Sequence, residues 1–83
     1  MAEELKSITS PLPGIFYRRL NPTAKEYVQE GDLVQVGDTV GMIEIMKNFY
    51  EVKSEFAGRV HSFAVNNEDL IDIGQEIARI SVV

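Results

Sequence analysis

The sequence contains no cysteine and no tryptophan, and positive charge is scarce in it. Without cysteine, the 83-residue chain has no disulfide framework, no thiolate zinc site and no cysteine nucleophile. Lysine and arginine number 8 against 13 acidic residues, which leaves a net charge of −5. Because an acidic domain repels the phosphate backbone, we expect no binding to nucleic acid.

Long apolar runs are missing as well. No segment approaches the roughly 20 apolar residues of a membrane span, and no basic, apolar signal peptide opens the chain. We therefore expect a soluble, cytoplasmic protein that does not associate with a membrane. A chain of 83 residues forms one domain at most, with a thin core that is a poor host for a deep catalytic cleft.

What the chain does contain is a series of short runs rich in β-branched and aromatic residues, separated by turns with Gly, Asn or Asp. This pattern predicts an all-β fold. The polar residues 1–7 are expected to form a disordered N-terminal segment. The expected strands are Ile15–Tyr17, Val40–Ile45, Phe49–Ser54, Gly58–Ala64 and Glu76–Val82.

The segment Asn21–Tyr27 does not fit the strand pattern. Asn21 followed by Pro22 is typical of the start of a helix, but the segment is too short to hold a helix alone. We expect either one turn of helix or a protruding loop.

The chain repeats itself in two registers. Asp32–Gly37 resembles Asp69–Gly74 at an offset of 37 residues, and Ser10–Ile15 resembles Ser54–Arg59 at an offset of 44. The difference of seven residues falls between Gly14 and Gly31 and identifies an insertion there. The repeat therefore predicts two equivalent halves around one core, with the insertion as an excursion from the first half.

The centre of this near-symmetry is Glu44-Ile45-Met46-Lys47-Asn48. The strands expected on both sides leave a tight turn at Met46, Lys47 and Asn48, which exposes Lys47 at a hairpin tip. A Met at a turn is unfavourable unless a partner binds it. A flexible lysine linked to a cofactor by an amide becomes a tether between separate active sites, and the cofactor supplies the chemistry.

Glu44-Ile45-Met46-Lys47 resembles the Glu-Ala-Met-Lys-Met signature of biotinyl domains, which belong to one family with lipoyl domains. Gly14-Ile15-Phe16-Tyr17-Arg18 is similar to the Gly-x-Phe-Tyr-Arg segment of the biotin carboxyl carrier proteins of acetyl-CoA carboxylase. Pro22-x-Ala24-Lys25 resembles their Pro-Asp-Ala-Lys thumb, and the whole resemblance covers about residues 8–82.

The resemblance implies a fold, a cofactor and partners. The fold would be a flattened barrel or sandwich of two four-stranded antiparallel sheets, with residues 8–83 as the biotinyl carrier domain and a thumb at about 19–27. A biotin protein ligase would attach biotin to Lys47, with Met46, Glu44 and Asn48 as the other cofactor-binding residues. A biotin carboxylase would charge the biotin, and a carboxyltransferase would pass the carboxyl group to an acyl-CoA, with acetyl-CoA expected, for fatty-acid synthesis. The resemblance implies a carrier that is not itself an enzyme.

Two alternatives stay open. A lipoyl carrier domain would have the same fold, although lipoyl domains usually place Asp before the lysine, where this chain has Met46. An unmodified scaffold is suggested by Ile45 and Asn48, which replace the Ala and Met of the signature. Many of these carriers have a long Ala/Pro-rich leader, so we expect either a domain of a longer protein or a short carrier.

Other candidate residues are given structural roles. His61 has no Ser, Cys or second His arranged around it, so we expect a strand histidine that is not catalytic. The four phenylalanines are expected in the core, and Tyr17 and Tyr27 are expected to pack the thumb against the sandwich. Arg18 and Arg19 are expected to be solvated or to face a partner. The aspartates expected to cap backbone N–H groups at turns, and not to bind a metal, are Asp32, Asp38 and Asp69.

Overall fold

The structure, a computed structural model, describes residues 4–82, which contain eight β-strands and no helix. The strands form two four-stranded antiparallel sheets, ordered β1-β8-β6-β3 and β5-β4-β2-β7. The expected all-β fold of two such sheets is confirmed. The strands are β1 (Glu4–Thr9), β2 (Gly14–Tyr17), β3 (Leu33–Val34), β4 (Thr39–Ile45), β5 (Asn48–Lys53), β6 (Gly58–Phe63), β7 (Leu70–Ile71) and β8 (Glu76–Val82).

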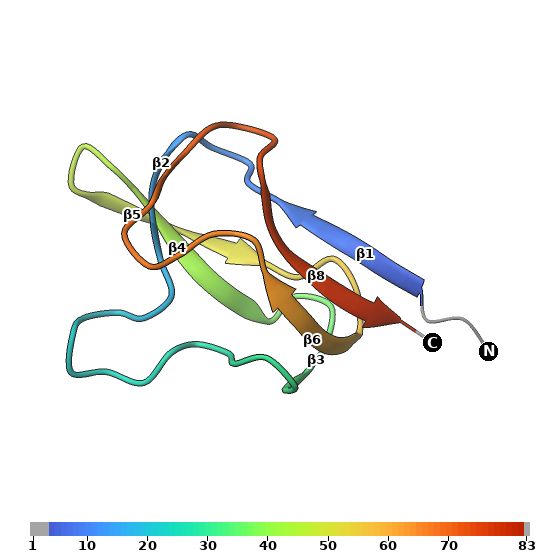
Figure 1. Ribbon diagram of the computed structural model, residues 1–83. Helices are drawn as coiled ribbons and strands as arrows, with labels where there is room; N and C mark the ends of the chain where they lie inside the picture. The colour runs from blue at the N-terminus through green and yellow to red at the C-terminus, as the bar shows by residue number, and fades with distance from the viewer. Residues whose placement is uncertain (1–3, 83) are drawn as a thin grey trace.

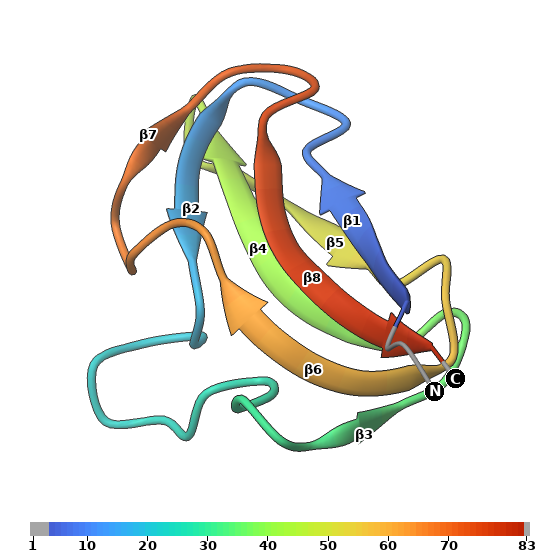
Figure 2. The same ribbon diagram turned by 45° about the vertical axis from the view of Figure 1, so that its right-hand side comes forward.

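The two sheets pack into a long, flat molecule with extents of 44 × 27 × 20 Å (Figures 1 and 2). Glu4 at the start of β1 pairs with Val82 at the end of β8, so the first and last described strands lie together at one end. The β4–β5 hairpin projects from the opposite end (Figure 1). The centre of the chain therefore lies at the opposite end of the molecule from the pair of Glu4 and Val82 (Figure 1).

The predicted repeat is confirmed by the strands themselves. β3 and β4 recur as β7 and β8 at an offset of 37 residues, and β1 recurs as β5 at an offset of 44. The turns repeat too, because the Gly37 N–H donates to the carbonyl of Ser54 and the Gly74 N–H donates to the carbonyl of Ser10. Each of these hydrogen bonds joins one half to the other, so the halves form one folding unit.

The core is filled by equivalent residues from the two halves. All of them are buried, and they form one apolar cluster between the sheets. Neither half has enough apolar surface to cover its own face, so each depends on the other for burial. The equivalent pairs are Ile8 with Val52, Phe16 with Val60, Val28 with Val65, Val34 with Ile71, Val40 with Ile77, and Ile43 with Ile80.

The N-terminal expectation needs correction. A disordered segment over residues 1–7 is wrong for Glu4–Ser7, which belong to β1, while residues 1–3 lie outside the described residues. β1 is held because its backbone pairs with β8 and because Ile8, with 2% exposure, anchors it in the core. The two-residue strands β3 and β7 also went unpredicted.

The segment Asn21–Tyr27 is a protruding loop, the second of the two forms expected from the sequence (Figure 2). The Oδ1 of Asn21 accepts hydrogen bonds from the N–H and hydroxyl of Thr23, at 3.0 and 2.8 Å. A backbone bridge between Arg19 and Glu26 closes the loop at its base. We call residues 19–27 the thumb.

The aspartates expected to cap turns do so. The carboxylate of each one accepts a hydrogen bond from the backbone N–H three residues earlier, at 2.8–2.9 Å. These residues are Asp32, Asp38 and Asp69. The described residues bring no three His, Cys, Asp or Glu side chains together as a metal site, and none of their elements is a helix suited to crossing a membrane.

One prediction concerns the part of the core where the two halves differ in size. A Cβ on Gly41 would lie 2.3 Å from the Phe16 ring, whereas the equivalent residues in the other half are Ala78 and Val60. Gly41→Ala should lower the free energy of unfolding by about 1–3 kcal/mol by overpacking. Phe16→Val should lower it by about 2–4 kcal/mol by leaving a cavity.

The double variant copies the packing of the other half. Its loss of stability should be smaller than the sum of the two single losses by more than about 1 kcal/mol. Urea denaturation of the four proteins measures this coupling. Simple additivity would show that Gly41 and Phe16 do not share one packing space.

Candidate functional site

The β4–β5 hairpin turns in two residues, Met46 and Lys47. Ile45 pairs directly with Asn48, so Asn48 belongs to β5. The expectation that Asn48 lies in the turn is wrong. Met46 has φ 50° and Lys47 has φ 68°, which is the left-handed geometry of a type I′ turn. Asn and Gly favour such positions, while other residues there cost on the order of 1–3 kcal/mol each. The backbone of this turn is therefore strained, and the demands of folding do not explain why Met and Lys occupy it.

Both side chains of the turn are exposed. Met46 has 88% of its surface accessible, although large apolar side chains are normally buried. Lys47 is also exposed, and it takes part in none of the ion pairs of the described residues. Its amine is therefore accessible to an enzyme that acts on it.

Behind the tip, Glu44 is fixed by a neighbouring strand. The hydroxyl of Tyr17 on β2 donates to Oε1 of Glu44 on β4 at 2.9 Å. The Tyr17 ring packs on Phe49 of β5, with centroids 6.0 Å apart. The hydrogen bond to Glu44 raises the pKa of Tyr17, and burial and the negative charges of Glu44 and Glu68 raise it further. Three strands are thus tied together directly below the tip.

A pocket of about 480 Å³ opens between the thumb and the hairpin. Its walls come from β2, the thumb, β5 and the β6–β7 turn, and its volume is in the range of small-molecule sites. Phe49 is the pocket residue nearest in sequence to Lys47. We call it the thumb pocket; it is lined by Tyr17, Arg19, Leu20, Asn21, Pro22, Phe49, Asn67 and Glu68.

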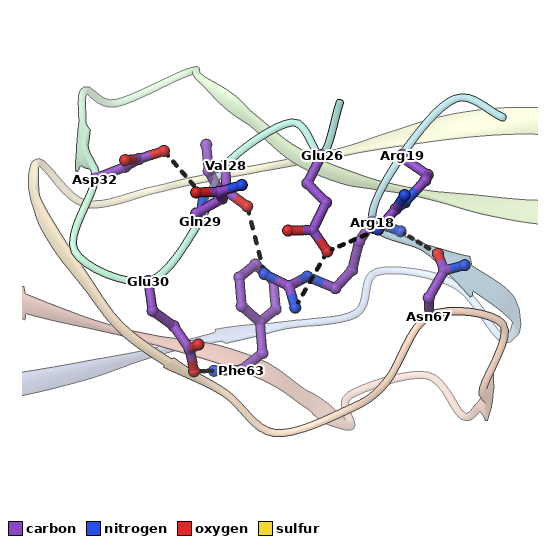
Figure 3. Close-up of polar contacts among 9 residues, drawn as sticks. All are labelled: Arg18, Arg19, Glu26, Val28, Gln29, Glu30, Asp32, Phe63 and Asn67. Carbon is purple, nitrogen blue, oxygen red and sulfur yellow. Dashed lines mark hydrogen bonds and ion pairs between the residues drawn. The ribbon is translucent and has the colours of Figure 1, made fainter. Parts of the chain in front are cut away.

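The thumb is held at its base by two arginines and one carboxylate (Figure 3). Oε2 of Glu26 lies 3.5 Å from Nη1 of Arg18 and 3.3 Å from Nη2 of Arg19. The side chains of Arg18 and Glu26 are both only 18% exposed. Burial makes this charge cluster stronger than a surface ion pair, because solvent screens it less.

Arg18 also joins the thumb base to the sandwich (Figure 3). Its guanidinium stacks 3.9 Å above the centroid of the Phe63 ring, and its backbone N–H donates to Oδ1 of Asn67 at 2.8 Å. The expectation that Arg18 is solvated is therefore wrong, because its side chain is only 18% exposed. The arginine is a structural anchor that fixes the thumb over the pocket.

The structure brings some predicted residues together and separates others. Glu44 and Lys47 lie on the same hairpin. Tyr17 contacts Glu44 and also lines the thumb pocket. Phe49 was expected in the core but is 51% exposed and lines the pocket. His61 is exposed, and its Nδ1 lies 3.0 Å from the hydroxyl of Ser62, away from this pocket's lining.

The fold and the site together define a small duplicated β-domain that presents one accessible lysine on a strained hairpin. The chain belongs to the family described as biotin-requiring enzymes, whose biotinyl/lipoyl domain model matches residues 6–80.

Carrier proteins from several organisms are similar to it. The biotin carboxyl carrier protein of acetyl-CoA carboxylase from Porphyra purpurea is 38% identical over 74 residues, which are 89% of this chain and 47% of that protein. The protein of the same name from Chlamydia muridarum is 38% identical over 73 residues, 88% of this chain and 45% of that protein. The chain therefore spans about half the length of these relatives.

A solved structure agrees with the fold. The crystal structure of the Kluyveromyces lactis urea carboxylase contains a region with a TM-score of 0.77 and 26% sequence identity. The match covers 96% of this chain and 6% of that much longer one.

The strain at the tip predicts a gain of stability on substitution. Met46→Asn combined with Lys47→Gly introduces the sequence that a type I′ turn favours and should raise the free energy of unfolding by about 1–2 kcal/mol. Lys53→Gly is the control, because φ is not positive at Lys53 and glycine there should lower stability. An unchanged or lowered stability of the Asn-Gly variant, measured by urea denaturation, would contradict the strain.

The raised pKa of Tyr17 gives a second test. Because folding favours the neutral phenol, this contribution to stability is present below the pKa of an unfolded tyrosine, near 10, and is lost as the pH rises through the higher folded value. In an alkaline titration followed by ultraviolet absorbance, one of the three tyrosines should ionise last. Glu44→Gln should lower that last pKa, and Tyr17→Phe should remove the late step. A late step that persists in Tyr17→Phe would assign it to another tyrosine.

Proposed function

We propose that Lys47 carries covalently attached biotin and that this domain is a carboxyl carrier. The observation that carries the proposal is the accessible lysine on a two-residue turn that costs stability. A domain selected only for folding gains nothing from Met and Lys at these positions, whereas an enzyme that modifies the lysine needs it displayed. The family match and the similar carrier proteins support biotin as the group.

Biotin supplies a ureido nitrogen that can hold a carboxyl group for transfer. The chain's own contribution is mechanical. The paired strands β4 and β5 hold the backbone of Lys47, while its flexible side chain serves as the tether. Tethering replaces free diffusion by a high local concentration at each active site. Glu44 and Asn48 flank the tip and Met46 projects beside the lysine, so these residues offer the contacts for recognition.

The proposal implies three partners. A biotin protein ligase would act on the amine of Lys47, a biotin carboxylase would load the carboxyl group, and a carboxyltransferase would deliver it to an acyl-CoA. The similar proteins of acetyl-CoA carboxylase support acetyl-CoA as the acceptor and a role in fatty-acid synthesis. The domain itself would perform no bond-making step; its residues would display the lysine that carries the cofactor.

Intact mass after co-expression with a biotin protein ligase tests the proposal. The protein should gain the mass of one biotin, and Lys47→Arg should gain none because the guanidinium is not a nucleophile at neutral pH. Lys53→Arg is the matched control, since Lys53 lies on β5 and pairs with Glu51, and it should be loaded like the unmodified sequence.

Three results would contradict the proposal. A gain that persists in Lys47→Arg would place the cofactor elsewhere. A gain of lipoate but not biotin, with a lipoate ligase in place of the biotin ligase, would make the domain a lipoyl carrier. No gain with either ligase would favour an unmodified scaffold, the alternative to which Ile45 and Asn48 point.

A further inference from the structure

The two halves of the domain contain the same turn twice, and the two copies differ at the third position in a way that affects the backbone. The turn Gln29–Asp32 and the turn Asn66–Asp69 each close with a backbone hydrogen bond from the last residue to the first, at 3.0 and 3.2 Å. In both, the third residue has positive φ: 95° at Gly31 and 70° at Glu68. The same backbone shape is therefore made once with glycine and once with glutamate.

The glutamate is not required by the turn. The Gly31 N–H donates to the carbonyl of Val60 at 2.7 Å, and the Glu68 N–H donates to the carbonyl of Phe16 at 2.6 Å, so both copies make the same contact with the sheet. Left-handed backbone is unfavourable for a side chain as long as glutamate and free for glycine. A strained residue that its own duplicate shows to be dispensable for folding points to a function.

Glu68 is one of the residues that line the thumb pocket, and the negative charge of its carboxylate contributes to the raised pKa of Tyr17 in the same lining. The only side-chain hydrogen bond of Glu68 among the described residues is a long one, 3.5 Å, from the amide of Asn67. The other charged group of the wall, Arg19, is already paired with Glu26. The pocket thus presents one carboxylate with unused acceptor capacity, beside the apolar surfaces of Tyr17 and Phe49.

We infer that Glu68 is a ligand-positioning residue, whose carboxylate accepts an N–H of the ureido ring when the biotin on Lys47 rests in the thumb pocket. This inference rests on the proposed function. The ureido ring is neutral and has N–H donors on a flat apolar body, which match a lining of one carboxylate and two aromatic rings. Its attachment point, Lys47, is two residues from Phe49 in the sequence. A carboxylate accepts such hydrogen bonds more strongly than a neutral group does.

The test compares biotin-loaded and unloaded domains, with loading verified by mass. In the unmodified sequence, loading should raise the melting temperature and shift the ring resonances of Tyr17 and Phe49 in NMR spectra. In Glu68→Gly, the unloaded domain should melt about 4–8 °C higher because the strain is relieved, and the increment from loading should fall by half or more. Glu68→Gln keeps the strain and should lose most of the increment because it lacks the charge.

Two control variants separate strain from ligand contact. Gly31→Ala has open space for its Cβ, so it measures the cost of positive φ alone and should melt lower with an unchanged loading increment. Glu55→Gln removes an exposed carboxylate outside the pocket and should change neither value.

The inference is overturned if Glu68→Gly and Glu68→Gln both keep the full loading increment and the same Tyr17 and Phe49 shifts. It is equally overturned if loading leaves those resonances unmoved in the unmodified sequence. Absence of biotin on Lys47 in the unmodified sequence would instead count against the proposed function, so the two failures are distinct.

Discussion

Mutual burial of the two half-faces of the sandwich is the constraint on which the rest of the structure depends. Every large buried side chain has an equivalent in the other half, and the turns at Gly37 and Gly74 each donate a hydrogen bond to a serine carbonyl of the opposite half. An 83-residue domain buries little surface, so neither half could persist alone. The duplication thereby fixes the strand order, brings the first and last strands together and leaves the joining hairpin at the far end.

Because equivalent positions face equal structural demands, the places where the halves differ mark what folding does not require. Two such differences meet at the thumb pocket. The thumb interrupts the first half alone and forms part of the pocket, and Glu68 stands in the wall where its duplicate is Gly31. The third special feature, the strained Met46–Lys47 turn, has Phe49 of the pocket two residues beyond it. The features that depart from the repeat, or that folding alone does not explain, therefore lie at or next to the thumb pocket.

Much of this could be predicted from the sequence, because strand periodicity and the repeat reflect burial directly. The longer strands and the tip at Lys47 followed from those patterns. β3 and β7 were missed because two residues carry no periodicity, and β1 because a single buried residue, Ile8, holds an otherwise polar strand. The repeat could have indicated β1, because its residues align with those of β5 at the offset of 44.

The site was harder to predict than the fold for a related physical reason. Phe49 was expected in the core because hydrophobicity alone does not tell an inward from an outward strand position at the edge of a sheet. Arg18 was expected in solvent, since its stacking on Phe63 and its pairing with Glu26 join segments that are distant in sequence. Glu68 could have been found from its alignment with Gly31, because a glycine replaced by glutamate in a repeated turn is costly wherever φ is positive.

Stability and function therefore compete at only a few residues of this domain. Met46, Lys47 and Glu68 are the non-glycine residues with positive φ in the described chain, and each would be replaced by Asn or Gly if folding alone decided. The paired strands and the duplicated core offset this cost, since they tie down both sides of each strained turn. A rigid frame holds strained turns in one geometry, and a flexible side chain on such a turn can move without moving the frame. The proposed role of Lys47 as a carrier of biotin would use this arrangement, because the side chain could move while the domain stays folded.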